Sequence, residues 1–461
     1  MGKPELMEEV RICSYPMPGY GLLPSSIEQV EKAAPDLIVC QGTSTDCGPF
    51  YLGEGKSFLD ASNVKADLRT ILDLALRLRI PFIFSLGGAG GDVHLEEALG
   101  IVGSLAHEEG WRFSTAVISG ELDKEWLRDR IGSGAKSHKL APLERLPDEI
   151  PIGEVDRSTR IVAQMGPEPI MKALDLVESG DVNGIIVGRS LDTGLLAAPL
   201  LKRKFSKPNC WHFGLVLHDG GQATEPTGHD GTLGVATNDY FTISPLSPFR
   251  RCTPTSVASM SFYERADITR EYYPGGYLDL SKAKFEQVDL RTVKVSGSEW
   301  FEMPYTIKVE GAAPIGYRTI SIAGLRDPIL ISHIQEMIVG VKKYVAEHIG
   351  TAGYRVHIRT YGRNGVLEGV EPTPDDDVHE LGIVIDIVAQ DQTLANRVCS
   401  LARSSLLHIG FQGRKSTAGN LAFPYSPHDV PVGRVYEFNI WHAVELENPL
   451  EPFPIKVREF A

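Results

Sequence analysis

The chain has 461 residues, of which 42% are hydrophobic and 23% charged, a composition typical of a globular protein of roughly two or three domains. Its formal net charge is −14, and its 46 basic residues form no stripe that would suit a nucleic-acid backbone. No stretch approaches the roughly 18 apolar residues of a membrane span, and the six cysteines show no C-x-x-C spacing. We therefore expect a cytoplasmic protein with free thiols and with neither a nucleic-acid nor a membrane partner.

Short apolar runs alternate with segments of helical periodicity over the first half of the chain. This alternation is typical of a mostly parallel sheet with flanking helices, because strands that are buried on both faces are apolar throughout. The predicted strands are Val10–Ser14, Asp36–Gln41, Pro81–Leu86, Trp111–Ser119, Arg160–Met165, Gly184–Val187 and Trp211–Leu217. The predicted helices are Ser25–Ala34, Asn63–Arg79, Asp92–Glu109, Asp123–Arg130, Pro167–Glu178 and Thr193–Lys204. Residues 1–219 are therefore expected to form an α/β domain.

The second half divides into two further segments. Residues 220–315 are rich in Gly, Pro and Thr, which indicates an irregular, β-rich insertion or connecting region whose topology the pattern does not assign. Residues 316–461 predict an α+β domain. Its expected elements are strand Tyr317–Ala323, helix Pro328–His348, strands Tyr354–Tyr361 and Leu381–Val388, helix Leu394–His408 and strand Val435–Trp441. The order β-α-β-β-α-β is that of a ferredoxin-like split unit.

Small and polar residues follow five of the predicted strands, in loops that should lie at one edge of the sheet. Ligands bind outside the carboxyl ends of the strands in open α/β sheets. The loops begin with GTSTDCG at residue 42, GGAGGD at 87, GE at 120, GRSLDTG at 188 and HDGG at 218. We expect the functional site at this edge.

The GGAGGD loop is the candidate anion cradle. Glycines allow the backbone to approach a ligand closely, and the next helix begins with free N–H groups. The residues concerned are Gly87, Gly88, Ala89, Gly90 and Gly91. The loop matches neither a Walker A motif nor G-x-G-x-x-G, because Val93 stands where the last glycine belongs. Asp92 is either a candidate acid or a simple helix cap.

Carboxylates, hydroxyls and one histidine in these loops are candidates for acid–base chemistry and substrate contacts. Asp46, Asp192, Asp92 and His218 are the candidate catalytic residues. Thr43, Ser44, Thr45, Arg189 and Ser190 are candidate substrate contacts, and Arg414 and Lys415 form a small basic spot near the C-terminus. Surface ion pairs and hydroxyl-rich turns are the alternatives for these residues. The pairs His218-Asp219 and His229-Asp230 lack the spacing of a compact metal motif, and we assign no metal site. Nothing identifies a cofactor.

Several stretches resemble the acyclic terpene utilisation (AtuA-type) family. They are VCQGTSTDCGPFYLG, FSLGGAGGD, VNGIIVGRSLDTG, CTPTSVASMSFYE, YYPGGYLDLSKAKFEQV and GYRTISIAGLRDP, and they occur in this order along most of the chain. The resemblance implies a role in the catabolism of branched terpenoid or acyl-CoA intermediates. It also implies a small partner subunit, because some relatives carry an extra C-terminal domain that others have as a separate protein.

The leading hypothesis is a catabolic enzyme, a lyase of the hydratase or dehydratase type, acting on a small carboxylate or acyl-CoA-type substrate. The residues that support it are the carboxylates of the loops, in a chain without a G-x-S-x-G elbow or a dinucleotide fingerprint. Asp46→Asn and Asp192→Asn are expected to abolish turnover. The alternative is a non-catalytic binding or assembly subunit of a complex with the small partner. We expect a homo-oligomer and an anionic small-molecule substrate.

Overall fold

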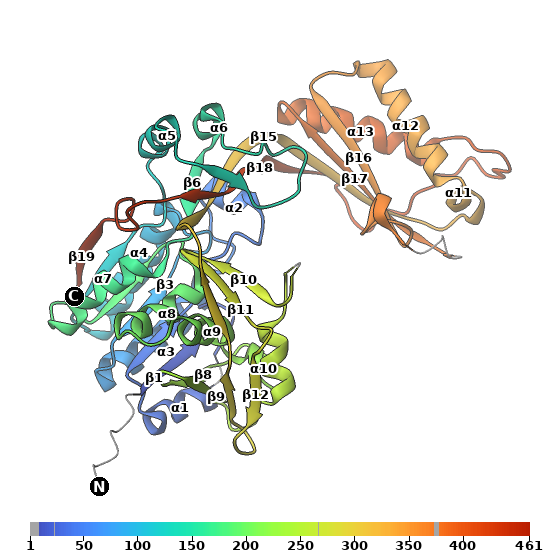
Figure 1. Ribbon diagram of the computed structural model, residues 1–461. Helices are drawn as coiled ribbons and strands as arrows, with labels where there is room; N and C mark the ends of the chain where they lie inside the picture. Colours follow the sequence, from blue (N-terminus) through green and yellow to red (C-terminus); the bar gives the residue numbers. More distant parts are fainter. Residues whose placement is uncertain (1–8, 23, 266, 373–377) are drawn as a thin grey trace, which may run out of the picture. The chain divides into compact units, whose positions relative to one another are not determined.

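A computed structural model describes residues 9–461 except 23, 266 and 373–377 (Figure 1). The chain divides into two compact units. Unit 1 consists of Met1–Ala313 and Phe438–Ala461, and unit 2 of Pro314–Glu437. Residues 220–313, the larger part of the expected connecting region, therefore belong to the same unit as the α/β segment.

A ten-stranded sheet forms the centre of unit 1. Its strand order is β12-β13-β9-β8-β1-β2-β3-β7-β4-β19. Five neighbouring strands are parallel: β1 (Val10–Tyr15), β2 (Leu37–Cys40), β3 (Phe82–Ser85), β7 (Gly184–Val187) and β4 (Phe113–Ile118). The prediction of an α/β fold is thereby confirmed, but the sheet is mixed rather than mostly parallel.

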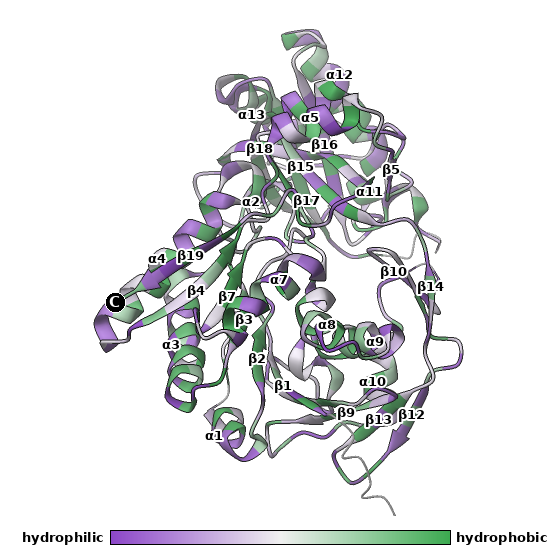
Figure 2. Cartoon of the chain, turned by 60° about the vertical axis from the view of Figure 1, so that its left-hand side comes forward, coloured by the Kyte–Doolittle hydropathy of each residue, from purple (hydrophilic) through white to green (hydrophobic). Residues whose placement is uncertain are grey.

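The central strands are apolar on both faces, as Figure 2 shows by their colour, because each face packs against its own layer of helices. Ile83 and Ile185 belong to one apolar cluster, while Phe82 and Ile186 belong to the other. The first cluster includes residues of α7 (Pro167–Glu178), α8 (Asp192–Lys202) and α9 (Lys207–Leu217). The second includes residues of α1 (Pro24–Ala33), α3 (Ala61–Leu78) and α4 (Asp92–Glu109). Both faces of the sheet are thus covered, and the loops at its strand ends are left to form a site.

Antiparallel strands extend the sheet at both edges. Beyond β1 lie β8 (Thr232–Ala236), β9 (Tyr240–Pro245), β13 (Val293–Ser296) and β12 (Lys284–Gln287), and β19 (Ile455–Phe460) pairs with β4. A separate three-stranded sheet contains β10 (Arg270–Tyr273), β11 (Gly276–Asp279) and β14 (Glu299–Glu302). The remaining elements of unit 1 are α2 (Pro49–Glu54), α5 (Lys124–Gly132), β5 (Ser137–Lys139), α6 (Ile152–Arg157), the 3-10 helix Gly220–Ala223 and α10 (Pro254–Ser261). The region of unassigned topology therefore contains the strands β8 to β14 and the first part of β15.

Two strands that were predicted for the parallel sheet are absent from it: one segment is a helix, and the other is a strand of a different sheet. The segment Trp211–Leu217 is the second part of α9, not a strand. Every residue of α9 from Asn209 to Leu217 is buried, so its sequence shows no polar face from which a helical period could be recognised. Strand β6 (Arg160–Ala163) pairs antiparallel with β15 (Thr306–Leu325) and lies outside the main sheet. Among the described residues, no helix combines the length and apolar character needed to cross a membrane.

Unit 2 contains one sheet with helices packed on it. Along the chain it runs through β15, α11 (Pro328–Ser332), α12 (Ile334–Ile349), β16 (Tyr354–Tyr361), β17 (Leu381–Ala389), α13 (Gln392–His408) and β18 (Asp429–Glu445). The strands lie in the order β16-β17-β15-β18, and β17 is antiparallel to both its neighbours. Apolar residues of α12 and α13 form one cluster with the buried residues of β17.

Candidate functional site

The loops that follow β2, β3, β4 and β7 lie against one another, as expected for the carboxyl ends of parallel strands. The amide of Ser44 donates to the Gly88 carbonyl at 2.8 Å, and the amide of Arg189 donates to the Gly90 carbonyl at 2.9 Å. Glycine is needed at these contacts, since a Cβ on Gly90 would lie 2.6 Å from the Arg189 nitrogen. Gly87 and Gly88 border a small cavity of about 30 Å³. The glycines of GGAGGD therefore allow loops to pack closely.

The N-terminus of α4, where the cradle was predicted, holds a carboxylate of the chain itself. Glu121 Oε2 accepts a hydrogen bond from the Asp92 amide at 2.7 Å. Burial raises the pKa of Glu121, and the hydrogen bond from that amide partly offsets the shift. The Asp92 carboxylate accepts a hydrogen bond from the Ser119 hydroxyl, and Asp92 does not line either large pocket described below. Glu121 thus occupies the place expected for an anionic ligand.

Replacement of Gly90 by alanine is expected to lower the free energy of unfolding by about 1–3 kcal/mol, because the added methyl group overpacks the loop contact. The residue also has a φ of +77°, which alanine rarely adopts. Gly100→Ala is the matched control, since a Cβ at this exposed position in α4 meets no atom within 4 Å. Urea unfolding should show Gly100→Ala as stable as the unmodified protein or more so. Equal stability of Gly90→Ala would contradict the packing role.

Arg189, a predicted substrate contact, is buried in an internal ion pair. Its Nε lies 2.9 Å from Glu310 Oε2, and its Nη1 donates to the Thr43 carbonyl at 3.0 Å. Glu310 also accepts from the Thr45 hydroxyl at 2.9 Å and lies 3.0 Å from Lys308 Nζ. Burial would raise the pKa of Glu310, but the charges of Arg189 and Lys308 outweigh it and lower the pKa to about 2. The network ties β15 to the strand-end loops.

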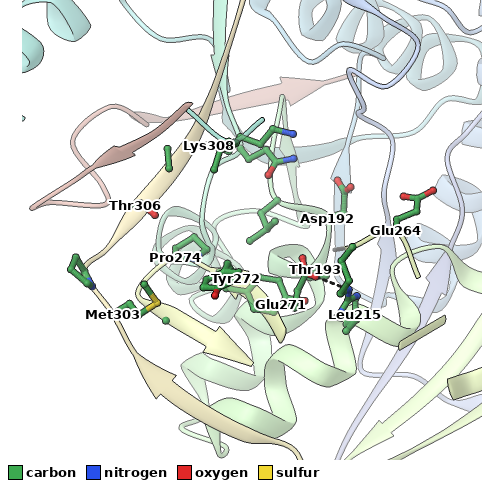
Figure 3. Close-up of a pocket in the computed structure, with 18 of the residues that line it drawn as sticks. Asp192, Thr193, Leu215, Glu264, Glu271, Tyr272, Pro274, Met303, Thr306 and Lys308 are labelled. Atoms are coloured by element: carbon green, nitrogen blue, oxygen red, sulfur yellow. Dashed lines mark ion pairs between the residues drawn. The ribbon is translucent and has the colours of Figure 1, made fainter. Parts of the chain in front are cut away.

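Two adjoining pockets in unit 1 share one wall. The first, here called the apolar pocket, has a volume of about 740 Å³ (Figure 3). Its lining includes Leu140, Leu191, Leu215, Tyr273, Pro274 and Met303. The second, here called the polar pocket, has a volume of about 600 Å³ and includes Gln41, Ser44, Asp46, Asp219, Gln222 and His229. The shared wall consists of Asp192, His218, Tyr263 and Glu264.

His218, Asp219 and Tyr263 form a triangle of polar contacts in this shared region. His218 Nε2 lies 3.3 Å from Asp219 Oδ2 and 3.2 Å from the Tyr263 hydroxyl, which donates to Asp219 Oδ2 at 3.3 Å. His218 Nδ1 lies 2.9 Å from the Leu215 carbonyl, which can only accept, so this nitrogen carries a proton. The contacts hold the imidazole ring in one orientation, with its Nε2 side toward Asp219.

The pKa values of His218 and Asp192, the two acid–base groups in the shared wall, are shifted by their surroundings. Burial alone would lower the pKa of His218, but the carboxylates of Asp219 and Asp192 outweigh it and raise the pKa to about 9. Burial raises the pKa of Asp192, and the opposing charge of Arg189 reduces this shift. Asp192 Oδ1 lies 3.8 Å from Arg189 Nη1 and has no hydrogen-bond partner among the described residues. The site therefore holds a protonated imidazole and a carboxylate, one oxygen of which has no hydrogen-bond partner among the described residues.

His218 is expected to remain protonated at pH 7 and to titrate near pH 9, which its ring resonances in an NMR titration would report. Because this pKa lies above the ordinary value of 6.5, its contribution to stability is present below pH 6.5 and is lost as the pH rises toward 9. Asp219→Asn should lower the pKa of His218, since it removes the largest charge that favours the imidazolium. An unchanged titration in Asp219→Asn would contradict this assignment.

The structure brings together some of the predicted site residues. Asp46, Asp192, His218 and Ser44 line the polar pocket, whereas Thr43, Thr45 and Arg189 serve the buried network. The Ser190 hydroxyl is buried and has no partner among the described residues. In unit 2, the guanidinium of Arg414 donates to the carbonyl of His408, the last residue of α13, and to the carbonyl of Ala418 in the loop that follows. Lys415 is exposed.

Four residues that line the apolar pocket were not predicted from the sequence: Tyr263, Glu264, Arg265 and Glu271. They lie in the region of unassigned topology, so no strand-end argument pointed to them. The available signal was the stretch CTPTSVASMSFYE, which ends with Tyr263 and Glu264. Within the described ranges, no three His, Cys, Asp or Glu side chains are arranged so that they could hold a metal ion.

Comparison with known proteins identifies one family. Residues 249–430 match the model of the acyclic terpene utilisation family protein AtuA, and this segment includes Tyr263, Arg265 and the motifs CTPTSVASMSFYE, YYPGGYLDLSKAKFEQV and GYRTISIAGLRDP. Asp192 and His218 lie outside the matched residues. Neither a curated protein nor a solved structure matches the chain. The match confirms the resemblance predicted from the motifs: residues 249–430 are similar to the acyclic terpene utilisation (AtuA-type) family.

Proposed function

We propose that the protein is a catabolic enzyme, a lyase of the hydratase or dehydratase type, that acts on a small carboxylate or acyl-CoA-type substrate in the pockets of unit 1. The observation that carries the proposal is the position of Asp192 and His218 in the wall shared by the two pockets. Addition or removal of water requires one group that takes a proton from carbon and another that protonates the leaving hydroxyl. A carboxylate and an imidazolium at one wall can supply both.

Asp192 is the base in this proposal and His218 the acid. Asp192 keeps an oxygen without a hydrogen-bond partner among the described residues, and burial brings its pKa closer to neutrality. A carboxylate in this state can accept a proton from a weakly acidic C–H group more effectively than one held by strong hydrogen bonds. His218 keeps its proton at neutral pH because Asp219 faces its Nε2. Asp219 and Tyr263 position this imidazole.

The polar pocket suits the part of a substrate that donates hydrogen bonds. Four carboxylates line it, so a bound anion would be repelled there; they are Asp46, Asp192, Asp219 and Glu264. Hydroxyl groups and water, which donate to carboxylates, fit this surface better. Asp46 is exposed, and its Oδ2 accepts a hydrogen bond from the Ser44 hydroxyl at 2.7 Å, which orients it within the pocket. We therefore place the water or hydroxyl of the reaction on this side of Asp192.

A non-catalytic subunit of a complex is the second candidate, and an exposed apolar surface favours it. Phe249 is 80% exposed and Leu290 is 90% exposed. Hydrogen bonds between the two segments, from Arg291 Nε to the Arg250 carbonyl and from the Cys252 amide to the Arg291 carbonyl, bring them close together. Large exposed apolar side chains that lie close together suit a contact with another protein. The partner would be a small subunit or a second copy of this chain, and we place the complex in the cytoplasm. In this proposal, unit 2 is a ferredoxin-like domain that serves as a second assembly module.

Thermal-shift screening against CoA esters and hydroxy- or dicarboxylates, followed by turnover assays of each ligand that binds, separates the two candidates. The enzyme proposal predicts that at least one bound ligand is converted. Binding without conversion, also with a co-purified partner from the native host present, would favour the subunit. Recovery of the chain alone, as a homo-oligomer, would count against a partner subunit.

A further inference from the structure

Arg265 is a buried cation in the wall of the apolar pocket, and its bonding is incomplete. The side chain is 9% exposed, and its Nε lies 2.9 Å from Glu271 Oε2 and donates to the Tyr263 carbonyl at 3.2 Å. Nη1 is buried and has no hydrogen-bond partner among the described residues. A buried donor without a partner costs free energy, and the cost is higher for a charged group. A ligand oxygen that reaches Nη1 would remove that cost.

Carboxylates line the apolar pocket as well as cations, so an anion is favoured over a neutral oxygen only next to the cations; the carboxylates are Asp192, Glu264, Glu271 and Glu445. Lys308 lines the pocket as well, and its carboxylate partner Glu310 is shared with Arg189. The single carboxylate of Glu310 thus neutralises only part of the charge of Arg189 and Lys308. Glu271 is the carboxylate that competes for Arg265, but burial raises its pKa, which weakens its hold as an anion. A guanidinium N–H group forms strong hydrogen bonds with carboxylate and phosphate oxygens, and Nη1 of Arg265 has such a group without a partner among the described residues.

The surrounding residues define the rest of the ligand. Leu215, Tyr273, Pro274 and Met303 line the same pocket, and Figure 3 shows Leu215, Glu271, Pro274 and Met303 around it with Asp192 nearby. His218 belongs to this pocket too, so an anion at Arg265 lies in the same cavity as the proposed acid and base.

We infer that Arg265 binds the anionic end of an organic acid, a carboxylate or phosphate group on a short apolar body, and directs that body toward Asp192 and His218. This inference rests on the proposed function, because it names the class of substrate and the residue that recognises it. The polar pocket, with its carboxylates, would then receive the uncharged part of the substrate.

Calorimetric titration with hexanoate, and with hexanamide as its uncharged counterpart, tests the inference without turnover. The unmodified protein should bind hexanoate at least about tenfold more tightly than hexanamide, because a hydrogen bond to a charged group contributes more than one to a neutral group. Arg265→Gln should weaken hexanoate binding by roughly tenfold or more and leave hexanamide binding unchanged. Arg128→Gln is the control, since this exposed arginine pairs with Asp156 at the surface. It should change neither affinity.

Glu271→Gln provides a test in the opposite direction. Removal of the competing carboxylate should tighten hexanoate binding if Arg265 receives the anion, whereas a purely structural pair would give no gain.

Competition by inorganic phosphate would show that the site accepts phosphate oxygens, and its absence would assign the site to carboxylates. Unchanged hexanoate affinity in Arg265→Gln, or equal affinity for hexanoate and hexanamide, would overturn the inference. Arg265→Lys, which keeps the charge, replaces the glutamine variant if that variant does not fold. Hexanoate binding at Arg265 without any turnover would leave this inference standing and count against the proposed function instead.

Discussion

Replacement of Asp192 by asparagine is expected to lower kcat by roughly 10²–10⁴-fold, the usual contribution of a general acid or base. Asparagine keeps the size of the side chain but cannot accept a proton at neutral pH. The loss should fall mainly on kcat rather than KM, because the substrate's anionic end is bound by other residues. Steady-state kinetics on the substrate found by ligand screening would measure both constants.

Asp73→Asn is a suitable control for this experiment, since Asp73 is exposed on α3 and pairs with Arg77 at the surface. Its kinetic constants should equal those of the unmodified protein. The folded state of Asp192→Asn should also be intact, because Asp192 Oδ1 makes no hydrogen bond with the described residues. A kcat for Asp192→Asn within a factor of two or three of the control would rule out Asp192 as the base.

The second large effect concerns the buried network of Glu310. Replacement of Glu310 by glutamine should lower the free energy of unfolding by about 3–5 kcal/mol, because it removes the closest counter-ion of the buried Arg189 and leaves only Asp192 at 3.8 Å. Glu310 has no exposed side-chain surface, and Arg189 is 3% exposed. Urea unfolding of the variant and the unmodified protein at pH 7 would measure the loss.

Glu96→Gln is the matched control, because Glu96 pairs with Arg458 at the surface, where an ion pair contributes about 1 kcal/mol or less. The network also predicts a dependence on pH. The pKa of Glu310 is lowered from 4.5 to about 2, so its stabilising contribution is present above pH 4.5 and is lost as the pH falls toward 2. If Glu310→Gln and Glu96→Gln had equally small effects, the network would not stabilise the fold.

The parallel strands, and the polar loops at their carboxyl ends where we place the site, could be foreseen from local patterns. Apolar runs such as Gly184–Val187, each followed by small polar residues, are typical of buried strands that end at a loop edge. Asp192 was found in this way, because it begins the helix after such a strand. His218 was predicted after a strand, but it follows helix α9.

The remainder of the site depends on contacts that no local pattern shows. The glycines of GGAGGD looked suited to a ligand, yet the atoms nearest Gly90 belong to Arg189, about one hundred residues later in the chain. Arg189 looked free to bind an anion, but its partner Glu310 lies 121 residues away in β15. Tyr263 reaches His218 from a segment in which Gly, Pro and Thr obscure the periodicity. Such pairings follow from the topology of the sheet and not from the spacing of residues.

The most direct test of the proposed proton transfer is hydrogen exchange at carbon. The full chain is incubated in D₂O with each carboxylate or CoA ester that binds, and the ligand C–H signals are followed by ¹H NMR. We expect at least one ligand to lose a C–H signal with time in the presence of the unmodified protein and to keep it in the presence of Asp192→Asn. Exchange at the same rate with Asp192→Asn, or no exchange of any tightly bound ligand, would contradict it.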